Sequence, residues 1–264
     1  MSHGQLSTGR TSDPQQSAPI AAGNAAQPWE KFDSAWYLAH NYANLRFDDK
    51  KILEWLADFF IATKAPAKGR GIDVGSGTNL YPSLAMLPMC EALTLVERSP
   101  ANVTWLQGQV GGFDSTWRPF WTALADAQPD HYKRVDPRAA MSVLATVRQG
   151  SIFDLPVGEW DLGTMFFVAE SITARREEFE TATQNFVRAL KPGSPFAAGF
   201  MKGSSGYWVD QCHFPAVAVH EDDISQCLAP VAYDVEVRLV PDAGDLLRDG
   251  YEGMILATGR AGPR

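Results

Sequence analysis

The sequence predicts an α/β fold with a doubly wound, mostly parallel, seven-stranded sheet that carries one antiparallel edge strand. Three observations predict it. Short apolar runs alternate with helical patterns from residue 70 to residue 201, which is the order of a parallel sheet with crossover helices. The first apolar run ends in a glycine turn, Gly75-Ser76-Gly77. Two further apolar runs close the chain with no helical pattern between them, so we expect the antiparallel edge there.

The predicted elements follow this pattern in order. Residues 29–60 place apolar side chains at three-and-four spacing, which predicts two helices, and Asp48 and Asp49 suit the N-terminus of the second one. The predicted strands cover residues 70–74, 92–97, 145–149, 160–168, 195–201, 233–240 and 252–258. Further helices are predicted at residues 80–86, 100–107 (capped by Ser99), 176–190 and 221–228, and residues 108–135 are expected to be irregular apart from one short helix.

The composition excludes several functional classes. The 264 residues carry 23 Lys and Arg against 31 Asp and Glu, a formal net charge of −8, and the cations are scattered. A nucleic-acid partner is therefore not expected, because it needs a basic stripe. No apolar run reaches the roughly 18 residues of a membrane span, and the N-terminus lacks the apolar core of a signal peptide. The three cysteines form no CxxC pair, so we expect a soluble, cytoplasmic protein without a disulfide framework or a metal site.

The chain is predicted to form one domain after a disordered leader. Residues 1–28 contain no aromatic residue and are rich in Ser, Gln, Gly, Ala and Pro, so they bury too little apolar surface to offset the entropy of ordering. Residues 29–264 are long enough to enclose a single core. Within this domain, residues 29–62 are expected to form the first helices.

The glycine turn and an acid farther along the chain predict a nucleoside site. In an open α/β sheet the ligand lies beyond the carboxyl ends of the strands, and glycines after the first strand let backbone N–H groups approach it. Glu97 ends the second predicted strand, 20 residues after Gly77, where an acid can bind ribose hydroxyls. Dinucleotide folds have a third glycine where this chain has Leu80, which disfavours a pyrophosphate. An NAD(P)-dependent oxidoreductase and a non-catalytic binding module remain the alternatives.

Several motifs resemble those of the nicotinamide, phenylethanolamine and thioether methyltransferases. The chain reads FDSAWYL at residues 32–38 with Tyr42 five residues after Tyr37, IDVGSG at residues 72–77 with Tyr81, and VE at residues 96–97 with Ser99 and Asn102. The resemblance runs from about Phe32 to the C-terminus, and its most specific part is the upstream element with the first two tyrosines. It implies a class I, Rossmann-like methyltransferase that uses S-adenosylmethionine, releases S-adenosylhomocysteine and has an N-terminal helical lid in residues 29–62.

The resemblance also implies roles for individual residues. Tyr37 and Tyr42 would close over the methionine end of the cofactor, and Glu97 would accept hydrogen bonds from the ribose hydroxyls. The other implied cofactor contacts are Gly75, Ser76, Gly77, Asn79, Tyr81 and Asn102, with Ser151 and Ile152 beside the adenine. The family has an acid at the adenine where this chain has Ser151, so the contact falls to this hydroxyl or to Asp154.

The acceptor side departs from the family pattern. The family holds amine acceptors with acids after the fourth and fifth strands, but this chain has Glu170 one place later than the aligned acid and no acid after the fifth strand. Glu170 is therefore the candidate catalytic residue, with a helix cap as the alternative role. The aromatic residues Phe166, Phe167, Tyr207 and Trp208 are expected to wall a flat, apolar acceptor. The prediction is methyl transfer to a small aromatic or heteroaromatic molecule, with nitrogen as the favoured atom.

Overall fold

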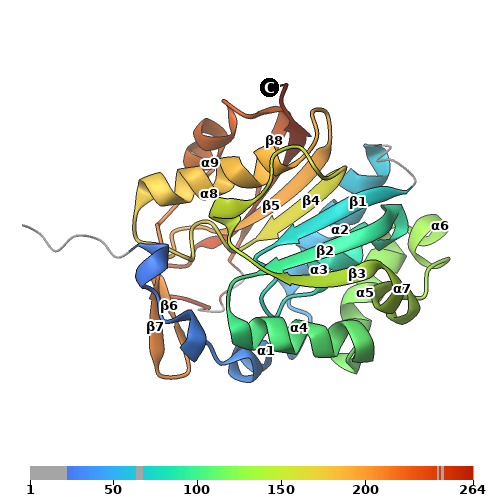
Figure 1. Ribbon diagram of the computed structural model, residues 1–264, viewed down its shortest axis with the longest axis horizontal. Helices are drawn as coiled ribbons and strands as arrows, with labels where there is room; N and C mark the ends of the chain where they lie inside the picture. Colours follow the sequence, from blue (N-terminus) through green and yellow to red (C-terminus); the bar gives the residue numbers. More distant parts are fainter. Residues whose placement is uncertain (1–22, 64–67, 243, 245–246, 264) are drawn as a thin grey trace, which may run out of the picture.

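A seven-stranded sheet organises the molecule, whose computed structural model describes residues 23–63, 68–242, 244 and 247–263. The strands are β1 (Gly69–Val74), β2 (Cys90–Glu97), β3 (Ala145–Gln149), β4 (Leu162–Phe166), β5 (Pro195–Met201), β8 (Ala232–Pro241) and β9 (Gly253–Ala261), in the spatial order β3-β2-β1-β4-β5-β9-β8 (Figure 1). The first five are parallel, whereas β9 runs antiparallel to both β5 and β8. The predicted doubly wound sheet with an antiparallel edge is confirmed.

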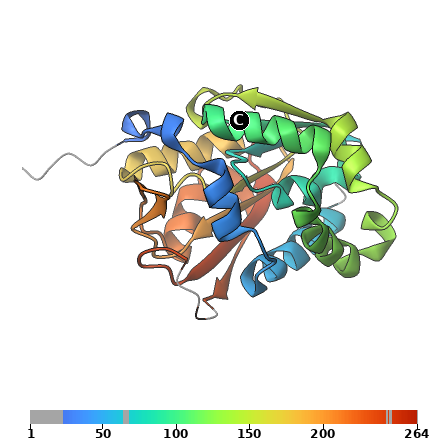
Figure 2. The same ribbon diagram turned by 90° about the horizontal axis from the view of Figure 1, so that it is seen from below.

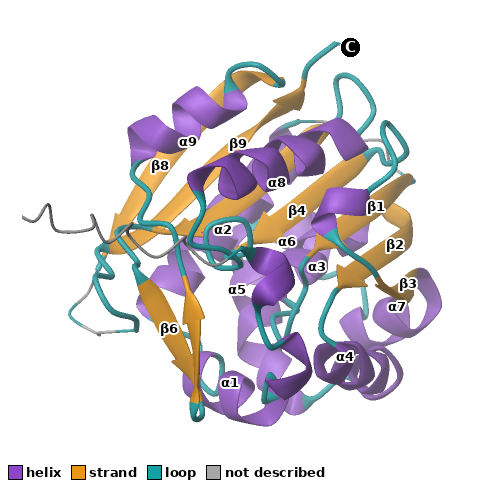
Figure 3. Cartoon of the chain, turned by 60° about the vertical axis from the view of Figure 1, so that its left-hand side comes forward, coloured by secondary structure: helices purple, strands orange, loops and turns teal. Residues whose placement is uncertain are grey.

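Helices cover both faces of the sheet (Figures 1 and 3). The core on one face includes Leu95 and Ala197, and the core on the other face includes Val96 and Ala198. Neighbours in the sequence fall into different cores because successive strand residues point to opposite faces. The first core is covered by α2 (Phe47–Ala62), α3 (Tyr81–Met86), α4 (Pro100–Gly112), α5 (Arg118–Ala127), α6 (Pro129–Tyr132) and α7 (Pro137–Leu144), and the second by α8 (Arg176–Ala189) and α9 (Glu221–Leu228).

Residues 118–144 contain more helix than the sequence predicted. The helices α5, α6 and α7 carry Pro119, Pro129 and Pro137 in their first turns. A proline suits the first turn because the N–H that it lacks has no partner there, and its fixed φ already matches the helix. These prolines therefore start helices. Two of the helices, α5 and α6, lie within residues 108–135, where the sequence predicted a single short helix in an otherwise irregular stretch.

The helix starts match the predictions only in part. Ser99 caps α4 as expected, because its side chain accepts a hydrogen bond from a backbone N–H of the first turn. Asp48 and Asp49 do not cap α2; they lie inside its first turn and are 1% exposed. Burial and the neighbouring Asp48 raise the pKa of Asp49 to about 8, so Asp49 contributes little negative charge to the helix terminus near neutral pH. Asp48 also accepts a hydrogen bond from the Tyr251 hydroxyl at 2.9 Å, which ties the start of α2 to the connection between β8 and β9.

The N-terminal segment crosses the molecule below the sheet, as Figure 2 shows in blue. It contains η1 (Asn24–Ala26), η2 (Trp29–Lys31) and α1 (Ser34–Asn41). The Asn24 backbone N–H donates to a carboxylate oxygen of Glu178 in α8 at 2.8 Å. The predicted leader is therefore too long at residues 23–28, which are held by tertiary contacts, while residues 1–22 lie outside the described residues.

A short hairpin that the sequence did not predict lies beside this segment. Its strands are β6 (Gly206–Val209) and β7 (Cys212–Pro215). The Phe214 ring lies 5.1 Å from the Trp29 ring and 5.5 Å from the Phe32 ring, measured between centroids. The hairpin and the N-terminal segment thus form one aromatic cluster that continues the fold beyond the carboxyl ends of the strands.

Candidate functional site

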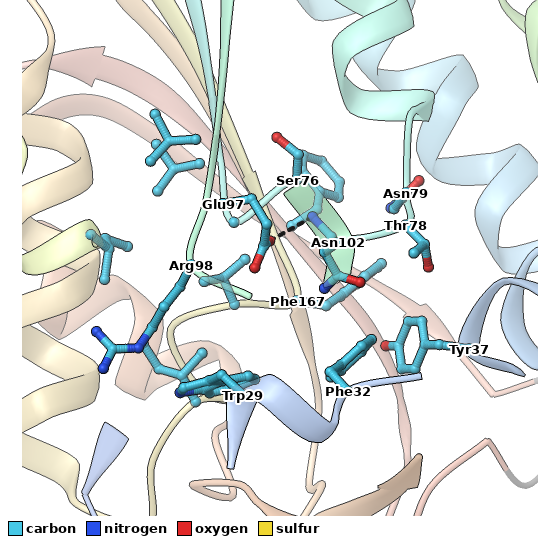
Figure 4. Close-up of a pocket in the computed structure, with 18 of the residues that line it drawn as sticks. Trp29, Phe32, Tyr37, Ser76, Thr78, Asn79, Glu97, Arg98, Asn102 and Phe167 are labelled. Atoms are coloured by element: carbon cyan, nitrogen blue, oxygen red, sulfur yellow. Dashed lines mark hydrogen bonds between the residues drawn. The ribbon is translucent and has the colours of Figure 1, made fainter. Parts of the chain in front are cut away.

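A pocket opens at the carboxyl ends of β1, β2 and β4 (Figure 4). The space between its walls, open mouth included, is about 760 Å³. The ends of three parallel strands, the glycine turn, the N-terminal segment and the hairpin all contribute to its walls. The lining residues are Asn24, Trp29, Phe32, Tyr37, Tyr42, Val74, Gly75, Ser76, Gly77, Thr78, Asn79, Val96, Glu97, Arg98, Asn102, Gly150, Ser151, Ile152, Phe166, Phe167, Val168, Ile172 and Tyr207.

The glycine turn forms the floor of the pocket. Gly75 has a φ of +67° and Gly77 a φ of +52°, a region that side chains with a Cβ rarely adopt. A Cβ on Gly75 would also meet the Val168 side chain at 2.5 Å. Glycine is therefore the residue that fits position 75, because it tolerates the positive φ and has no Cβ to clash with Val168. Without side chains at residues 75 and 77, the backbone of the turn can come close to a ligand in the pocket.

Glu97 is held in place by the same turn. One carboxylate oxygen accepts a hydrogen bond from the Gly77 N–H at 2.9 Å, and the other accepts one from the Ser99 N–H at 2.7 Å. Burial raises the pKa of Glu97, and these N–H donors oppose that rise. The Arg98 N–H and the Asn102 side chain also oppose the rise of this pKa, and each carboxylate oxygen can accept more than one hydrogen bond. The carboxylate is thus fixed at the pocket wall with acceptor capacity left for ligand hydroxyls.

Asn102 connects the pocket to the N-terminal segment. Its amide oxygen accepts a hydrogen bond from the Ser34 hydroxyl at 2.7 Å, and its backbone N–H donates to the Ser99 hydroxyl. Ser34 begins α1, which carries Tyr37 toward the pocket. The Asn102 side chain therefore links α1, which belongs to the predicted lid, to α4.

Two polar side chains of the pocket are left without partners. The Thr78 hydroxyl and the Asn79 amide nitrogen are buried, and neither has a hydrogen-bond partner among the described residues. The amide oxygen of Asn79 accepts from the Tyr81 N–H at 3.2 Å, which orients the nitrogen the other way. Buried polar groups are rarely left unpaired, so these two atoms indicate that the pocket takes a polar ligand.

Most of the residues predicted from the sequence come together in this pocket. Those that line it are Tyr37, Tyr42, Gly75, Ser76, Gly77, Asn79, Glu97, Asn102, Ser151, Ile152, Phe166, Phe167 and Tyr207. Tyr81, Glu170 and Trp208 do not line it. Tyr81 is fully buried behind Tyr42, with its ring edge-on to that tyrosine at 6.2 Å and stacked on Phe120 at 5.9 Å. The Tyr81 ring therefore packs behind the pocket wall.

Trp208 lies on the face of the hairpin that does not line the pocket. It is 54% exposed, whereas Tyr207 is 7% exposed and lines the pocket. The two are neighbours in β6, and neighbouring strand residues point to opposite sides. The aromatic wall of the pocket therefore includes Tyr207 without Trp208.

Glu170 does not reach the pocket either. It is fully buried, and one of its carboxylate oxygens accepts hydrogen bonds from the Met201 N–H at 3.0 Å and the Ser171 hydroxyl at 3.2 Å. The chain turns sharply after β4, where Phe167 has a φ of +59°, so strand alternation does not continue to residue 170. Burial raises the pKa of Glu170, opposed by the Met201 N–H and the Arg248 charge. Glu170 thus connects the segment after β4 to the end of β5 and is not among the residues that line the pocket.

Ser151 and Asp154 are the two residues that the sequence offers for the adenine contact. Ser151 lines the pocket, although its hydroxyl accepts from the Phe153 N–H at 3.2 Å as the cap of η5 (Ile152–Asp154). Asp154 is not among the lining residues. Of the two, the geometry brings Ser151 to the site.

Sequence reasoning missed several lining residues, above all Asn24, Trp29 and Phe32. The Trp29 indole N–H donates to the Asn24 backbone oxygen at 3.1 Å and to its side-chain oxygen at 3.0 Å. The signal that could have found them is Trp29, three residues ahead of the family motif that begins at Phe32. Figure 4 shows both rings on the side of the pocket opposite Ser76 and Asn79.

The sheet, the glycine turn and the acid at the end of β2 are together those of a class I, S-adenosylmethionine-dependent methyltransferase. The chain belongs to the NNMT/PNMT/TEMT family, whose sequence profile matches residues 22–261. The predicted resemblance is thereby confirmed, and the NAD(P)-dependent oxidoreductase alternative is wrong.

Individual relatives are distant. An indolethylamine N-methyltransferase of Oryctolagus cuniculus is 21% identical over 178 residues, which cover 62% of this chain and 66% of that protein, slightly less than two thirds of its length. A 1,6-didemethyltoxoflavin-N1-methyltransferase of Burkholderia thailandensis superposes with a TM-score of 0.55 at 14% identity, covering 96% of this chain and 99% of that one. An S-adenosylmethionine-dependent methyltransferase of Clostridium acetobutylicum gives 0.53 at 12% identity, covering 88% and 100%. These two structures share the fold.

The pocket fits the cofactor of this class, S-adenosylmethionine. The unpartnered Thr78 hydroxyl and Asn79 amide suit its polar amino-acid end, and the anchored Glu97 carboxylate suits its ribose hydroxyls. Within the described residues, no group of three or more His, Cys, Asp or Glu side chains could hold a metal ion. No helix in the described part of the chain is long and apolar enough to cross a membrane.

Proposed function

We propose that this protein transfers a methyl group from S-adenosylmethionine to a nitrogen atom of a small aromatic or heteroaromatic acceptor. The observation that carries the proposal is the aromatic wall of the pocket. Phe166, Phe167 and Tyr207 line it beside the glycine turn, and Trp29 and Phe32 line it from the N-terminal segment. Flat rings pack well against such a wall. The membership in a family that includes N-methyltransferases favours nitrogen over oxygen or carbon.

The side chains of the pocket would divide the work. Glu97 would accept the ribose hydroxyls, Thr78 and Asn79 would bind the amino-acid end, and Tyr37 and Tyr42 would cover it. When bound, the cofactor supplies an electrophilic methyl group, so the protein mainly has to position the acceptor lone pair and exclude water. The described lining residues contain no histidine and no acid other than Glu97. The acceptor that suits this pocket therefore presents a neutral nitrogen lone pair and needs no general base.

Two of the relatives named above methylate small molecules, which supports a small-molecule substrate here. We also propose a cytoplasmic location, because Cys90, Cys212 and Cys227 are all free thiols and no disulfide depends on an oxidising compartment.

A screen with methyl-labelled S-adenosylmethionine tests the proposal. Purified protein is incubated with pools of small heteroaromatic bases, aromatic amines, phenols and aliphatic amines, and the products are analysed by mass spectrometry. We expect label on heteroaromatic or aromatic nitrogen. Turnover confined to phenols or aliphatic amines would contradict the acceptor class. Tight cofactor binding with no turnover in any pool would favour the binding-module alternative.

A further inference from the structure

One carboxylate fixes the first described residues of the chain. The Asn24 backbone N–H donates to a carboxylate oxygen of Glu178 in α8 at 2.8 Å. Gly23 lies against the same group, since a Cβ added there would come within 2.5 Å of the other carboxylate oxygen. Among the described residues, no other hydrogen bond joins residues 23–32 to residues outside that stretch. The Glu178 side chain therefore sets where residues 23–32 begin.

Asn24 in turn holds the Trp29 ring. The Trp29 indole N–H donates to both oxygens of Asn24, the backbone oxygen at 3.1 Å and the side-chain oxygen at 3.0 Å. Asn24 is 4% exposed, and both residues line the pocket. Glu178 is not among the lining residues. A contact outside the pocket thus places two residues of the pocket wall.

Trp29 also borders a second hollow. The residues that line this hollow are Ala25, Gln27, Trp29, Glu30, Arg98, Pro100, Gln149, Gly150 and Ser151. Four of them also line the pocket, namely Trp29, Arg98, Gly150 and Ser151. The two spaces therefore adjoin, and a movement of Asn24 and Trp29 away from the pocket would join them.

The hydrogen bond to Glu178 differs in kind from the other contacts of this stretch with the body of the protein. Trp29 and Phe32 pack against Phe214 of the hairpin, with ring centroids 5.1 Å and 5.5 Å apart, and apolar contact has little directionality. A buried N–H, by contrast, needs an acceptor. Loss of the Glu178 acceptor therefore disfavours the closed position of Asn24, because its N–H can then find a partner only in water.

We propose that Glu178 is a positioning residue that holds Asn24 and Trp29 over the bound cofactor, and that the cofactor leaves toward the second hollow when this contact breaks. The Glu178 side chain is 28% exposed, so water can compete for the Asn24 N–H while α8 stays folded. The proposal concerns exchange of the cofactor and does not depend on which acceptor is methylated.

The test measures how fast labelled S-adenosylhomocysteine leaves the protein in an excess of unlabelled ligand. Glu178→Met removes the acceptor and should speed release by about tenfold. Glu178→Gln keeps an uncharged oxygen as acceptor, so release should speed up less. A wild-type release rate in Glu178→Met would overturn the proposal.

Glu177→Met is the matched control. Glu177 also lies in the first turn of α8, but it is exposed and outside the pocket. Its loss changes the charge at the helix terminus as Glu178→Met does, yet release should stay within about twofold of the wild-type rate. The ion pair that Glu178 makes with Arg175 at 3.7 Å is exposed and contributes little. An equal acceleration in Glu177→Met would assign the effect to charge and overturn the role of the Asn24 contact.

Amide hydrogen exchange separates an opened segment from a damaged fold. In the S-adenosylhomocysteine complex of Glu178→Met, residues 23–32 should exchange faster than in the wild type, while exchange in residues 129–144 stays the same. Faster exchange in both segments, or in neither, would contradict a positioning role.

Trp29→Phe keeps the proposal testable if Glu178→Met fails to fold. It retains a ring beside Phe214 and removes the N–H that binds Asn24, so release should speed up by about threefold to tenfold; an unchanged rate would overturn the proposal. If both variants fold, the double variant should exceed Glu178→Met by no more than about twofold, because the two changes break one connected contact. Fully multiplicative rates would mean two independent contacts. A failure to find any methyl acceptor would leave these results unaffected, so this proposal and the proposed function fail separately.

Discussion

The Glu97 carboxylate accepts a hydrogen bond from the Gly77 backbone N–H at 2.9 Å, which joins the end of β2 to the turn that follows β1. The two strands are neighbours in the sheet, with Val74 paired to Val96. The turn and the acid therefore share one support. A substitution at Glu97 or in the turn is therefore expected to alter the position of the other.

Replacing Glu97 with Ala should weaken binding of S-adenosylhomocysteine by about 1.5 to 3 kcal/mol, because two hydroxyls of the ligand lose a charge-assisted acceptor. Calorimetry measures the effect directly. Glu91→Ala is the matched control, since Glu91 lies on the same strand but is exposed and outside the pocket. An equal affinity for both variants would assign Glu97 to holding the turn and nothing more.

Replacing Gly75 with Ala should lower the free energy of unfolding by about 1 to 3 kcal/mol, because the position combines a φ of +67° with a 2.5 Å approach to Val168. Cofactor affinity should fall as the turn shifts. Gly108→Ala is the control. Gly108 lies inside α4, and a Cβ added there would have no atom within 4 Å. Alanine at this position should leave the free energy of unfolding unchanged or raise it by up to about 1 kcal/mol. Urea unfolding curves for both variants decide the point.

The sequence was a good guide where local pattern determines structure. The strands at 70–74 and 195–201 appear as β1 and β5 within one residue of the prediction, because short, largely apolar runs bounded by glycine or proline suit strands that are mostly buried. The positions of the glycine turn and of Glu97 were also predictable, since the turn follows β1 directly and Glu97 is the last residue of β2.

Other features depend on tertiary contacts that no local pattern records. The hairpin of β6 and β7 has strands of four residues each, too short for a clear alternation. Glu170 was assigned to the acceptor because the end of β4 was predictable, but the positive φ of Phe167 redirects the chain there. Arg248 comes from a connection far along the chain, and its contact with Tyr37 spans 211 positions in the sequence.

The stability of the protein should depend on the ionisation of Asp73. This carboxyl is buried and accepts hydrogen bonds from the Ser83 hydroxyl at 2.7 Å and the Thr164 hydroxyl at 2.8 Å. Burial raises its pKa from 3.8 to about 7, although these donors oppose the rise. Between these two pH values the unfolded chain loses the proton while the folded protein keeps it. The free energy of unfolding should therefore fall as the pH rises from about 4 to about 7, by no more than about 4 kcal/mol.

Asp73→Asn provides the check on this pH dependence. The amide cannot ionise, so the variant should show a flatter dependence of unfolding free energy over the same interval, measured by urea unfolding at pH 4, 5.5 and 7. Other acids contribute to both proteins equally. Parallel curves for the wild type and the variant would exclude Asp73 as the source.

The N-terminal segment should be stabilised by the cofactor. Trp29, Phe32 and Tyr37 line the pocket, and Trp29 and Tyr37 are only partly buried. Amide hydrogen exchange in residues 29–42 should slow when S-adenosylhomocysteine is added, since a bound ligand penalises local opening. Residues 129–144, which contain α6 and α7 and contribute nothing to the pocket, serve as the internal reference. Equal protection of both segments with and without ligand would show that the segment is no lid.

The final prediction concerns the acceptor and uses two neighbours on β6. Tyr207 lines the pocket and packs against the Arg248 guanidinium, whereas Trp208 is 54% exposed on the other side of the strand. Once an acceptor is known, Tyr207→Ala should raise the KM for that acceptor by about tenfold, because the variant loses one aromatic contact and part of the apolar area that the acceptor buries. Trp208→Ala should leave KM unchanged.

Tyr207→Phe separates the ring from the hydroxyl in the same assay. The ring keeps its place over Arg248 and against the acceptor, so KM should stay within about threefold of the wild-type value, because a ring contact survives the loss of one hydroxyl. S-adenosylhomocysteine affinity, measured in parallel, should change little in either variant if Tyr207 faces the acceptor. A large effect of Trp208→Ala with none from Tyr207→Ala would mean that the acceptor binds on the outer face of the hairpin, and the aromatic wall of the pocket would lose its assigned role.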